Sequence, residues 1–499
     1  MASPTRIRPN SRRLTAQDAS FLYGESINGP MHIGSVSYFE GEIPFEQAVE
    51  QVEQRLHLIP RYRQRLMFVP FNLGHATWED DPHFKIANHV FRHRLAPGTT
   101  EEGILEAAMA VHGPPLDRSK PLWEMHLFEG LPGRTVLLWK VHHCMVDGVS
   151  GIELTTVMFD FEAEAPPPAP PETAWAPAPL PDPGEAVSTA LLDAAQASLD
   201  SVRRVQGLFR SPAVLRERAV LLGEATRSMM EMATRPIVAA PWNQGPVSQK
   251  RMLAWAEFEF GEFRGVRGAL GGTVNDVVLA VLSEGAARYL AEHKVPTNGF
   301  PLRVGCPVNV RREGESGALG NRVSMMFPVL PAEPMPAVAR LDAVRRETER
   351  IKEAREPQGL ELMSETSDSM PPPLMGFASG VAMAGMDAAA AMASLLPSPL
   401  ASPARLAGQG VSFVATNVPG VQVPQYLAGR RMTATIGLIP LGGPLGYGVA
   451  IQSYNQKLYV GMMAEPRVMP DVGRMKAHVQ TAFADLKEAA LAATKPPST

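Results

Sequence analysis

The chain has 499 residues, of which 45% are hydrophobic, and a formal net charge of -4 at pH 7. This length exceeds that of a single-core domain and predicts two domains, while a near-neutral charge without a basic stripe argues against a nucleic acid as partner. The two cysteines, Cys144 and Cys306, are too few for a disulfide framework, so we expect reduced thiols and a cytoplasmic protein.

The first region of the chain leads to a histidine motif. Residues 1–13 are polar and basic without an apolar stretch, so no secretory signal is expected there. We expect helices over 45–56 and 101–111 and a strand over 135–141. This strand runs directly into the octapeptide VHHCMVDG at 141–148.

The octapeptide places two imidazoles, a carboxylate and a glycine at the end of a strand. Because side chains alternate along a strand, His143 shares a face with Val141 and His142 lies on the other, so only one histidine can face a given site. Gly148 permits a sharp bend, and Asp147 is well placed to cap a helix expected over 149–161. The pattern favours an acid/base site; the alternatives are a structural histidine pair and an ordinary Asp-Gly turn. No metal is expected, because no ligand cluster accompanies the histidines.

A connector follows the motif. Residues 163–186 are rich in proline, which predicts an extended, semi-rigid segment. Apolar residues recur at helical spacing over 187–209, and residues 201–235 carry seven arginines against three glutamates. A helix docked between the domains and a helix lying on a membrane surface both fit this pattern.

The second half begins with a strand-like run near residue 250. We expect helices over 275–293, 335–354 and 471–493, and strands over 411–416, 446–453 and 457–464. Residues 374–396 are weakly apolar with one charge in the middle, which indicates a buried or interfacial helix rather than a membrane span. The order of elements predicts an α/β fold of mixed sheets covered by helices, formed twice: a domain over 1–162, a connector over 163–245 and a domain over 246–499.

The pattern His-His-x-x-x-Asp-Gly after a strand resembles the acyltransferase superfamily of chloramphenicol acetyltransferase, carnitine acyltransferases and peptide-synthetase condensation domains. Within it, further segments resemble the bacterial wax ester synthase/diacylglycerol acyltransferase family. These are LTAQDASF at 14–21, PRYR at 60–63, Trp78 with Asp81, Phe84 and His89, PLDRSKPLWE at 115–124, VNDVVLA at 274–280, PVNVR at 307–311, LGNRVS at 319–324 and TNVPG at 416–420. Two departures occur: Thr416 replaces the usual serine, and AEPR at 464–467 interrupts a usual acidic-basic-acidic run.

The resemblance implies two chloramphenicol acetyltransferase-like domains that face each other across a central tunnel, with the motif at its middle. The implied reaction moves a long-chain acyl group from acyl-CoA to the hydroxyl of diacylglycerol or a fatty alcohol, with no cofactor and no metal. His143 is then the general base. Asn275 is a donor to the oxyanion, or alternatively a helix cap.

Other motif residues receive roles by the same resemblance. His142 is expected to pack or hydrogen-bond away from the tunnel. Asp147 is expected to fix the turn, with Arg311 or Arg322 as its partner, although a triad-like role for this carboxylate stays open. The residues expected to bind substrate are Gly148, Trp123, Asp276, Asn321 and Arg322. The segments 115–124 and 321–324 are expected to shape the acceptor and donor mouths of the tunnel, or alternatively to be turns that pack the domains together.

Two other functions remain open. One is a condensation-type enzyme that uses thioesters on carrier proteins, and the other is a non-catalytic lipid-binding protein. The acyl acceptors are nearly insoluble in water, so we expect peripheral attachment to the inner membrane or to lipid bodies. The segments 187–235 and 374–396 are the candidates for that contact.

Overall fold

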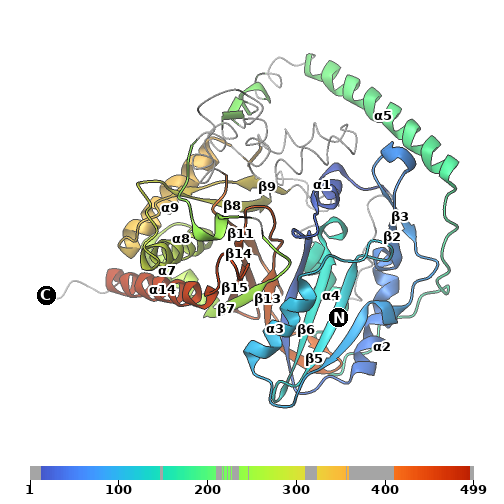
Figure 1. Ribbon diagram of the computed structural model, residues 1–499, viewed down its shortest axis with the longest axis horizontal. Helices are drawn as coiled ribbons and strands as arrows, with labels where there is room; N and C mark the ends of the chain where they lie inside the picture. Colours follow the sequence, from blue (N-terminus) through green and yellow to red (C-terminus); the bar gives the residue numbers. More distant parts are fainter. Residues whose placement is uncertain are drawn as a thin grey trace.

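The structure is a computed structural model, and it forms two lobes that each contain a sheet covered by helices (Figure 1). It describes residues 13–146, 150–209, 235–245, 247–309, 323–355, 357–358 and 410–494, together with parts of 216–227. The expected helix over 374–396 lies outside the described residues.

The first lobe is built on a six-stranded sheet of order β12-β13-β1-β6-β5-β4. Its strands are β1 (His32–Glu40), β4 (Val90–Arg94), β5 (Trp123–Glu129), β6 (Arg134–His142), β12 (Tyr426–Leu427) and β13 (Arg430–Leu438). Strands β4 and β5 are parallel and the other neighbours are antiparallel. In the register of β1 with β6, His32 lies opposite His142.

Helices and a small hairpin complete this lobe. The α-helices are α1 (Ala16–Gly24), α2 (Phe45–Arg55), α3 (Glu101–His112) and α4 (Ser150–Met158). The hairpin pairs β2 (Gln64–Met67) with β3 (Thr77–Asp80). Short 3-10 helices are η1 (Leu56–Leu58), η2 (Pro60–Arg63), η3 (Pro70–Asn72), η4 (Ile86–Asn88) and η5 (His143–Met145).

The second lobe has a sheet of order β10-β8-β11-β14-β15-β7, with β9 also paired to β8. Its strands are β7 (Met252–Glu259), β8 (Leu302–Asn309), β9 (Val323–Met326), β10 (Val329–Leu330), β11 (Phe413–Val418), β14 (Tyr447–Tyr454) and β15 (Lys457–Ala464). The 3-10 helix η6 (Pro241–Asn243) precedes β7. The helices lie together on the outer side of the sheet (Figure 1) and are α7 (Phe260–Leu270), α8 (Val274–Glu292), α9 (Ala337–Glu353) and α14 (Val472–Thr494).

One segment of the second half of the chain crosses to the first lobe. Strands β12 and β13 extend the first sheet, although the strands that flank them in sequence, β11 and β14, belong to the second. β13 also packs against β14 and β15. A Cβ on Gly461 would lie 2.8 Å from the carbonyl oxygen of Gly437, so a glycine is required where β15 approaches β13. The two sheets are thus joined in two ways: β13 runs from the second half of the chain into the first sheet, and the backbones of β13 and β15 are in close contact.

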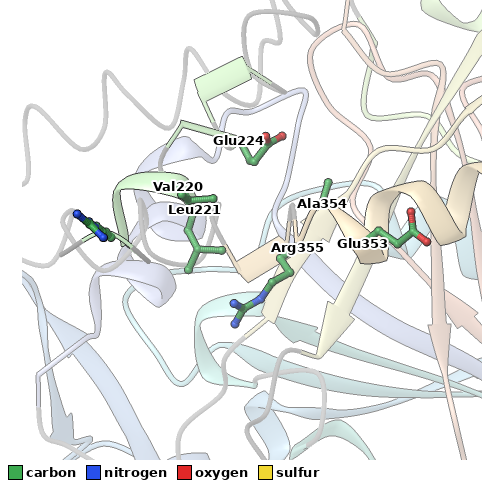
Figure 2. A pocket seen from close by; sticks show the side chains of 7 residues that line it. Val220, Leu221, Glu224, Glu353, Ala354 and Arg355 are labelled. Carbon is green, nitrogen blue, oxygen red and sulfur yellow. The ribbon is translucent and has the colours of Figure 1, made fainter. Parts of the chain in front are cut away.

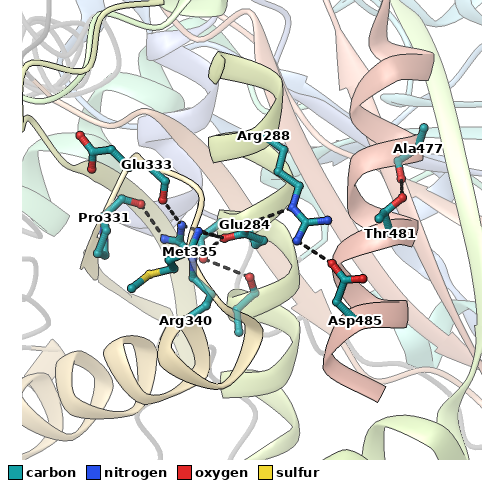
Figure 3. Close-up of polar contacts among 11 residues, drawn as sticks. Glu284, Arg288, Pro331, Glu333, Met335, Arg340, Ala477, Thr481 and Asp485 are labelled. Carbon is teal, nitrogen blue, oxygen red and sulfur yellow. Dashed lines mark hydrogen bonds and ion pairs between the residues drawn. The ribbon is translucent and has the colours of Figure 1, made fainter. Parts of the chain in front are cut away.

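The core of the second lobe encloses a pair of opposite charges. Helix α8 is almost entirely buried, and it carries Glu284 into contact with Arg340 of α9 (Figure 3). The Arg340 side chain is 1% exposed and donates to Glu284 Oε2 at 2.9 Å and to the carbonyl oxygens of Pro331 and Glu333, both at 2.6 Å. Arg288 links Glu284 to Asp485 of α14. Every charge of this buried group therefore has a partner, as burial of ions requires.

The predicted helices and strands agree closely with those observed, with two informative differences. The helix expected over 149–161 begins at Ser150 and ends at Met158, because Asp160 leaves it to form a bridge with Tyr426 of β12. The connector helix α5 (Pro183–Phe209) begins inside the proline-rich segment. It lies along the outer edge of the molecule in Figure 1. Among the described residues, no single helix is long and apolar enough to cross a bilayer, and only the bent pair α7 and α8 passes that test together.

Candidate active site

His143 stands at the end of the central strand β6, in the first position of η5. Its backbone N–H donates to the carbonyl oxygen of Met31 at 2.8 Å, which ties the turn to the start of β1. Its ring stacks on Phe21 of α1, with 3.7 Å between ring centroids and 10° between planes. A backbone bond and a stacked ring together fix the position of this imidazole.

The surroundings of His143 keep its ring neutral. Burial lowers its pKa to about 4, and the nearby His142 acts in the same direction, while contact with its own backbone acts in the opposite one. Nδ1 is buried, and no other described residue offers it a hydrogen bond. A neutral imidazole held in one place is what a general base requires at physiological pH.

His142 is completely buried on β6 and faces away from solvent. Its Nδ1 accepts a hydrogen bond from the backbone N–H of Cys144 at 3.1 Å. Its Nε2 lies 3.3 Å from Oε1 of Glu25, at the end of α1. Cys144 is buried, and burial raises its pKa well above the usual range, so its thiol stays protonated.

Several predicted site residues cannot be placed. Asp147, Gly148, Asn321 and Arg322 lie outside the described residues, as does Arg311. Their expected roles, and the partner of Asp147, stay predictions.

Asn275 lies in the first turn of α8, but it is not the cap of that helix. The cap is Thr273, whose hydroxyl accepts from the Asp276 backbone N–H at 3.1 Å in a reciprocal capping box. Asn417 of β11 donates from Nδ2 to Oδ1 of Asn275 at 3.3 Å. Two of the motifs that the sequence singled out, VNDVVLA and TNVPG, therefore meet through these amides.

Asp276 and Trp123 both make structural contacts. Asp276 is buried, and its carboxylate accepts from the backbone and hydroxyl of Thr273 at 2.8 Å and from the hydroxyl of Thr348 at 2.8 Å. Trp123 is 0% exposed, donates from Nε1 to the carbonyl oxygen of Tyr62 at 2.9 Å and stacks between Tyr62 and His89. These contacts anchor α8 and the first-lobe core; contact of either residue with substrate stays a prediction.

Glu25 and its partner Arg118 were not predicted as site residues. Their side chains meet at 2.7 Å, and Arg118 belongs to the motif segment 115–124. Nothing in the local spacing of a carboxylate at 25 relates it to a histidine at 142. The link appears only when α1 is packed beside the end of β6.

The described residues form two surface cavities, and neither includes His143. One surface cavity of about 340 Å³ lies between the connector and the end of α9, lined by Leu221, Glu353 and Arg355 among others (Figure 2). A second, of about 470 Å³, lies near Tyr426 and Arg430. Neither is lined by His143, so the central tunnel stays a prediction. Within the described ranges, no group of three or more His, Cys, Asp or Glu side chains is arranged to hold a metal ion.

Comparison with known proteins identifies relatives along the whole chain. The model of the wax ester synthase/diacylglycerol acyltransferase catalytic domain matches residues 14–278, and that of the C-terminal domain of the same family matches residues 319–487. The Mycobacterium tuberculosis protein named "Probable diacyglycerol O-acyltransferase tgs1" is 29% identical over 483 residues, covering 95% of both chains. The Acinetobacter baylyi protein named "O-acyltransferase WSD" is 27% identical over 480 residues, covering 94% of this chain and 95% of its own.

Solved structures share the fold. The wax ester synthase/diacylglycerol acyltransferase from Marinobacter aquaeolei VT8 superposes with a TM-score of 0.64 at 22% identity, covering 96% of this chain and 99% of its own. The first condensation domain of the calcium-dependent antibiotic synthetase superposes with a TM-score of 0.57 at 14% identity, covering 99% and 98%. The predicted mixed α/β fold of two domains is thereby confirmed.

Proposed function

The chain belongs to the wax ester synthase/diacylglycerol acyltransferase family, and we propose that it moves a long-chain acyl group from acyl-CoA to the hydroxyl of diacylglycerol or a long-chain alcohol. The observation that carries this proposal is the neutral, immobilised His143 at the end of β6. A protein that only bound lipid would have no use for a base in this position.

The proposed reaction is a direct transfer. His143 takes the proton of the acceptor hydroxyl as its oxygen attacks the thioester carbonyl, which becomes a tetrahedral oxyanion. When the carbon-sulfur bond breaks, the thiolate of CoA leaves and takes the proton back from His143. The products are an ester and free CoA, and the enzyme returns to its starting state without a covalent intermediate.

Asn275 is proposed to stabilise the oxyanion. The Oδ1 of Asn275 accepts a hydrogen bond from Asn417. The Nδ2 of Asn275 therefore lies on the other side of its amide group, where its hydrogens can be donated to another acceptor. Since the helix is capped by Thr273, the amide of Asn275 has no capping role to fulfil. An amide donor aimed at a developing oxyanion is a standard source of rate acceleration.

The direct test is incubation of purified protein with palmitoyl-CoA and, separately, with diacylglycerol or hexadecanol, followed by lipid analysis and assay of free CoA. Triacylglycerol or wax ester formed together with an equal amount of CoA supports the proposal. A parallel incubation with a palmitoyl thioester on a carrier protein tests the condensation-type alternative. If only the carrier-bound thioester reacts, the alternative is correct and the proposal is wrong.

We also propose that the enzyme attaches peripherally to the inner membrane or to lipid bodies through α5. Leu191, Leu192 and Leu199 of this helix are exposed, Leu192 to 71%. Near the start of α5, η3 exposes Phe71 to 90% on a left-handed backbone (φ 60°). Exposed apolar side chains of this kind enter a lipid interface readily.

Vesicle flotation tests this attachment. Wild type should float with anionic phosphatidylglycerol vesicles, and a variant with Arg203, Arg204 and Arg210 changed to Glu should not. A second variant, Leu191→Ser with Leu192→Ser, should float less than the control Leu491→Ser, which alters an exposed leucine of α14. Equal flotation of all variants would show that α5 is only a bridge between the lobes.

A further inference from the structure

Glu25 occupies an unusual position for a carboxylate, enclosed where α1 meets the end of β6. Its side chain is only 5% exposed. One oxygen, Oε2, accepts from Nε and Nη2 of Arg118 at 3.2 and 2.7 Å. The other, Oε1, accepts from the backbone N–H of Met31 at 2.9 Å and lies 3.3 Å from Nε2 of His142. A side chain with this many polar neighbours is held rigidly.

The contacts of His142 define its tautomer. Nδ1 accepts the backbone N–H of Cys144, so it carries no proton. The ring proton must then reside on Nε2, the nitrogen that faces Glu25. The carboxylate therefore selects this tautomer, and the tautomer in turn holds the backbone of η5.

A second route runs from Glu25 to His143 through the backbone. Glu25 accepts the N–H of Met31, and the carbonyl oxygen of Met31 accepts the N–H of His143 at 2.8 Å. The same carboxylate thus supports η5 from both ends: at Cys144 through the His142 ring, and at His143 through Met31. A displacement of about 1 Å of a base is enough to reduce a rate about a hundredfold.

The charges around Glu25 keep it ionised. Burial alone would raise its pKa, but the contact with His142, the Met31 N–H and Arg118 outweigh that effect and lower the pKa to about 2. Among the described residues, Lys140 and the protonated thiol of Cys144 also interact with it. Above pH 5 the carboxylate is therefore a constant feature of the site.

We propose that Glu25 is the positioning residue of the histidine pair, acting through the His142 tautomer and the Met31 backbone to orient His143. The proposal rests on the proposed function, in which His143 is the base. In this proposal Glu25, whose side chain is 5% exposed, acts through these neighbours and not by contact with substrate.

Kinetics of Glu25→Gln test the proposal. A neutral amide cannot accept from both Met31 and Arg118 and still present a negative charge to Nε2 of His142, so we expect kcat to fall about tenfold to a hundredfold, the range for loss of a supporting partner. KM for palmitoyl-CoA should stay within about threefold of wild type because Glu25 makes no ground-state contact. The control is Glu129→Gln, which removes a carboxylate of the same lobe paired with Arg92 and Arg94 and distant from the motif. Equal kinetic effects in both variants would overturn the proposal.

A double-mutant cycle separates positioning from general destabilisation. If Glu25 acts largely through His142, the variant Glu25→Gln/His142→Ala should be little slower than His142→Ala alone. Multiplied rate losses in the double variant would show that the two residues act independently, and the proposed path through His142 would be wrong.

A spectroscopic measurement on the wild-type protein tests the same idea without using activity or a variant. Long-range ¹H–¹⁵N correlation with ¹⁵N-histidine should show the His142 ring with its proton on Nε2 and none on Nδ1, and Glu25→Gln or the shorter Glu25→Asp should alter that signal. A wild-type His142 protonated on Nδ1 would overturn the proposal even if the enzyme were fully active. If the tautomer is as expected but no ester forms from any thioester, the proposed function fails while the role of Glu25 in orienting the turn stands.

Discussion

The two lobes bury charged groups in opposite ways. In the second lobe, Glu284 forms ion pairs with Arg340 and Arg288 (Figure 3). Arg340 donates its remaining hydrogen bonds to backbone carbonyl oxygens, so this closed charge group leaves no arginine or glutamate among the three without a partner. No described member of the group belongs to a motif of the proposed reaction. This arrangement stabilises the packing of α8 against α9 and α14.

The first lobe instead surrounds its motif with titratable groups whose pKa values are displaced. His32 and His112 are buried edge to face, 4.4 Å apart, and burial keeps their pKa values well below the usual range. Lys140 is 2% exposed, and burial lowers its pKa to about 8. Perturbed groups concentrate at functional sites, whereas closed charge networks are common in structural cores. The comparison therefore favours the first lobe as the source of the base and the closed charge group of the second lobe as a structural feature, while Asn275 of α8 remains the proposed contribution of the second lobe to the reaction.

The largest expected effect tests the chemistry of the first lobe. His143→Ala should reduce kcat by about a hundredfold to ten-thousandfold, because proton transfer from the acceptor is lost while the fold remains. His142→Ala should reduce it less, since that ring only supports the turn. Steady-state assays with palmitoyl-CoA on variants checked by circular dichroism give the comparison. Full turnover by folded His143→Ala protein would remove the basis of the mechanism.

The second prediction tests the architectural role of the other lobe. Arg340→Met removes one of the two arginine partners of the buried Glu284 and the donor to the carbonyl oxygens of Pro331 and Glu333, and we expect it to lower the free energy of unfolding by about 3–5 kcal/mol. The matched control is Arg350→Met in the same helix, where an exposed pair with Glu347 should contribute at most about 1 kcal/mol. Denaturant titration measures both. Turnover per folded molecule should be unchanged, and a selective loss of kcat in Arg340→Met would contradict the division between the lobes.

Local sequence patterns predicted most elements but not the contacts between distant ones. Helices such as α2 and α14 follow from apolar periodicity, which is a local property. The insertion of β13 into the first sheet depends on strand pairing across nearly 400 residues, and no local pattern records it. The same holds for the contact between Glu25 and His142, whereas His143 could be proposed as the base from the sequence because its motif is contiguous.

Acid should weaken the first lobe before the second. The histidines His32, His75, His112 and His143 have lowered pKa values in the folded state, from burial above all, and a usual value of 6.5 when unfolded. The unfolded chain therefore binds more protons as pH falls below 6.5, and the first lobe loses stability toward pH 4. The second lobe holds only His293 and His478, both partly exposed beside carboxylates.

Hydrogen exchange at pH 7 and pH 5, corrected for intrinsic rates, measures this difference. Protection should decrease first in β1, β6 and α3. Earlier opening of α8 and α14 would show that the buried histidines of the first lobe do not govern its acid stability.

A smaller effect is expected for the motif carboxylate. If Asp147 fixes the turn and caps α4, Asp147→Ala should lower stability by about 1 kcal/mol together with activity. Thermal melting and turnover of the same preparation distinguish this role from a triad-like one. An unchanged melting temperature with abolished turnover would instead indicate a triad-like role, in which Asp147 takes part in the reaction together with His143.

The smallest effect concerns pH in the physiological range. Because the pKa of His143 is lowered to about 4, the ring is already neutral at pH 6, and kcat/KM should be nearly constant from pH 6 to 8. Below about pH 4 the ring becomes protonated, loses its basicity, and the rate should fall about tenfold per pH unit. Acid unfolding would also decrease the rate at low pH, so each sample must regain full activity when it is returned to pH 7. A reversible decrease in rate with its midpoint near pH 6.5 would mean that His143 is exposed to water in the free enzyme. The burial that lowers the pKa values of the first-lobe histidines would then not apply to His143.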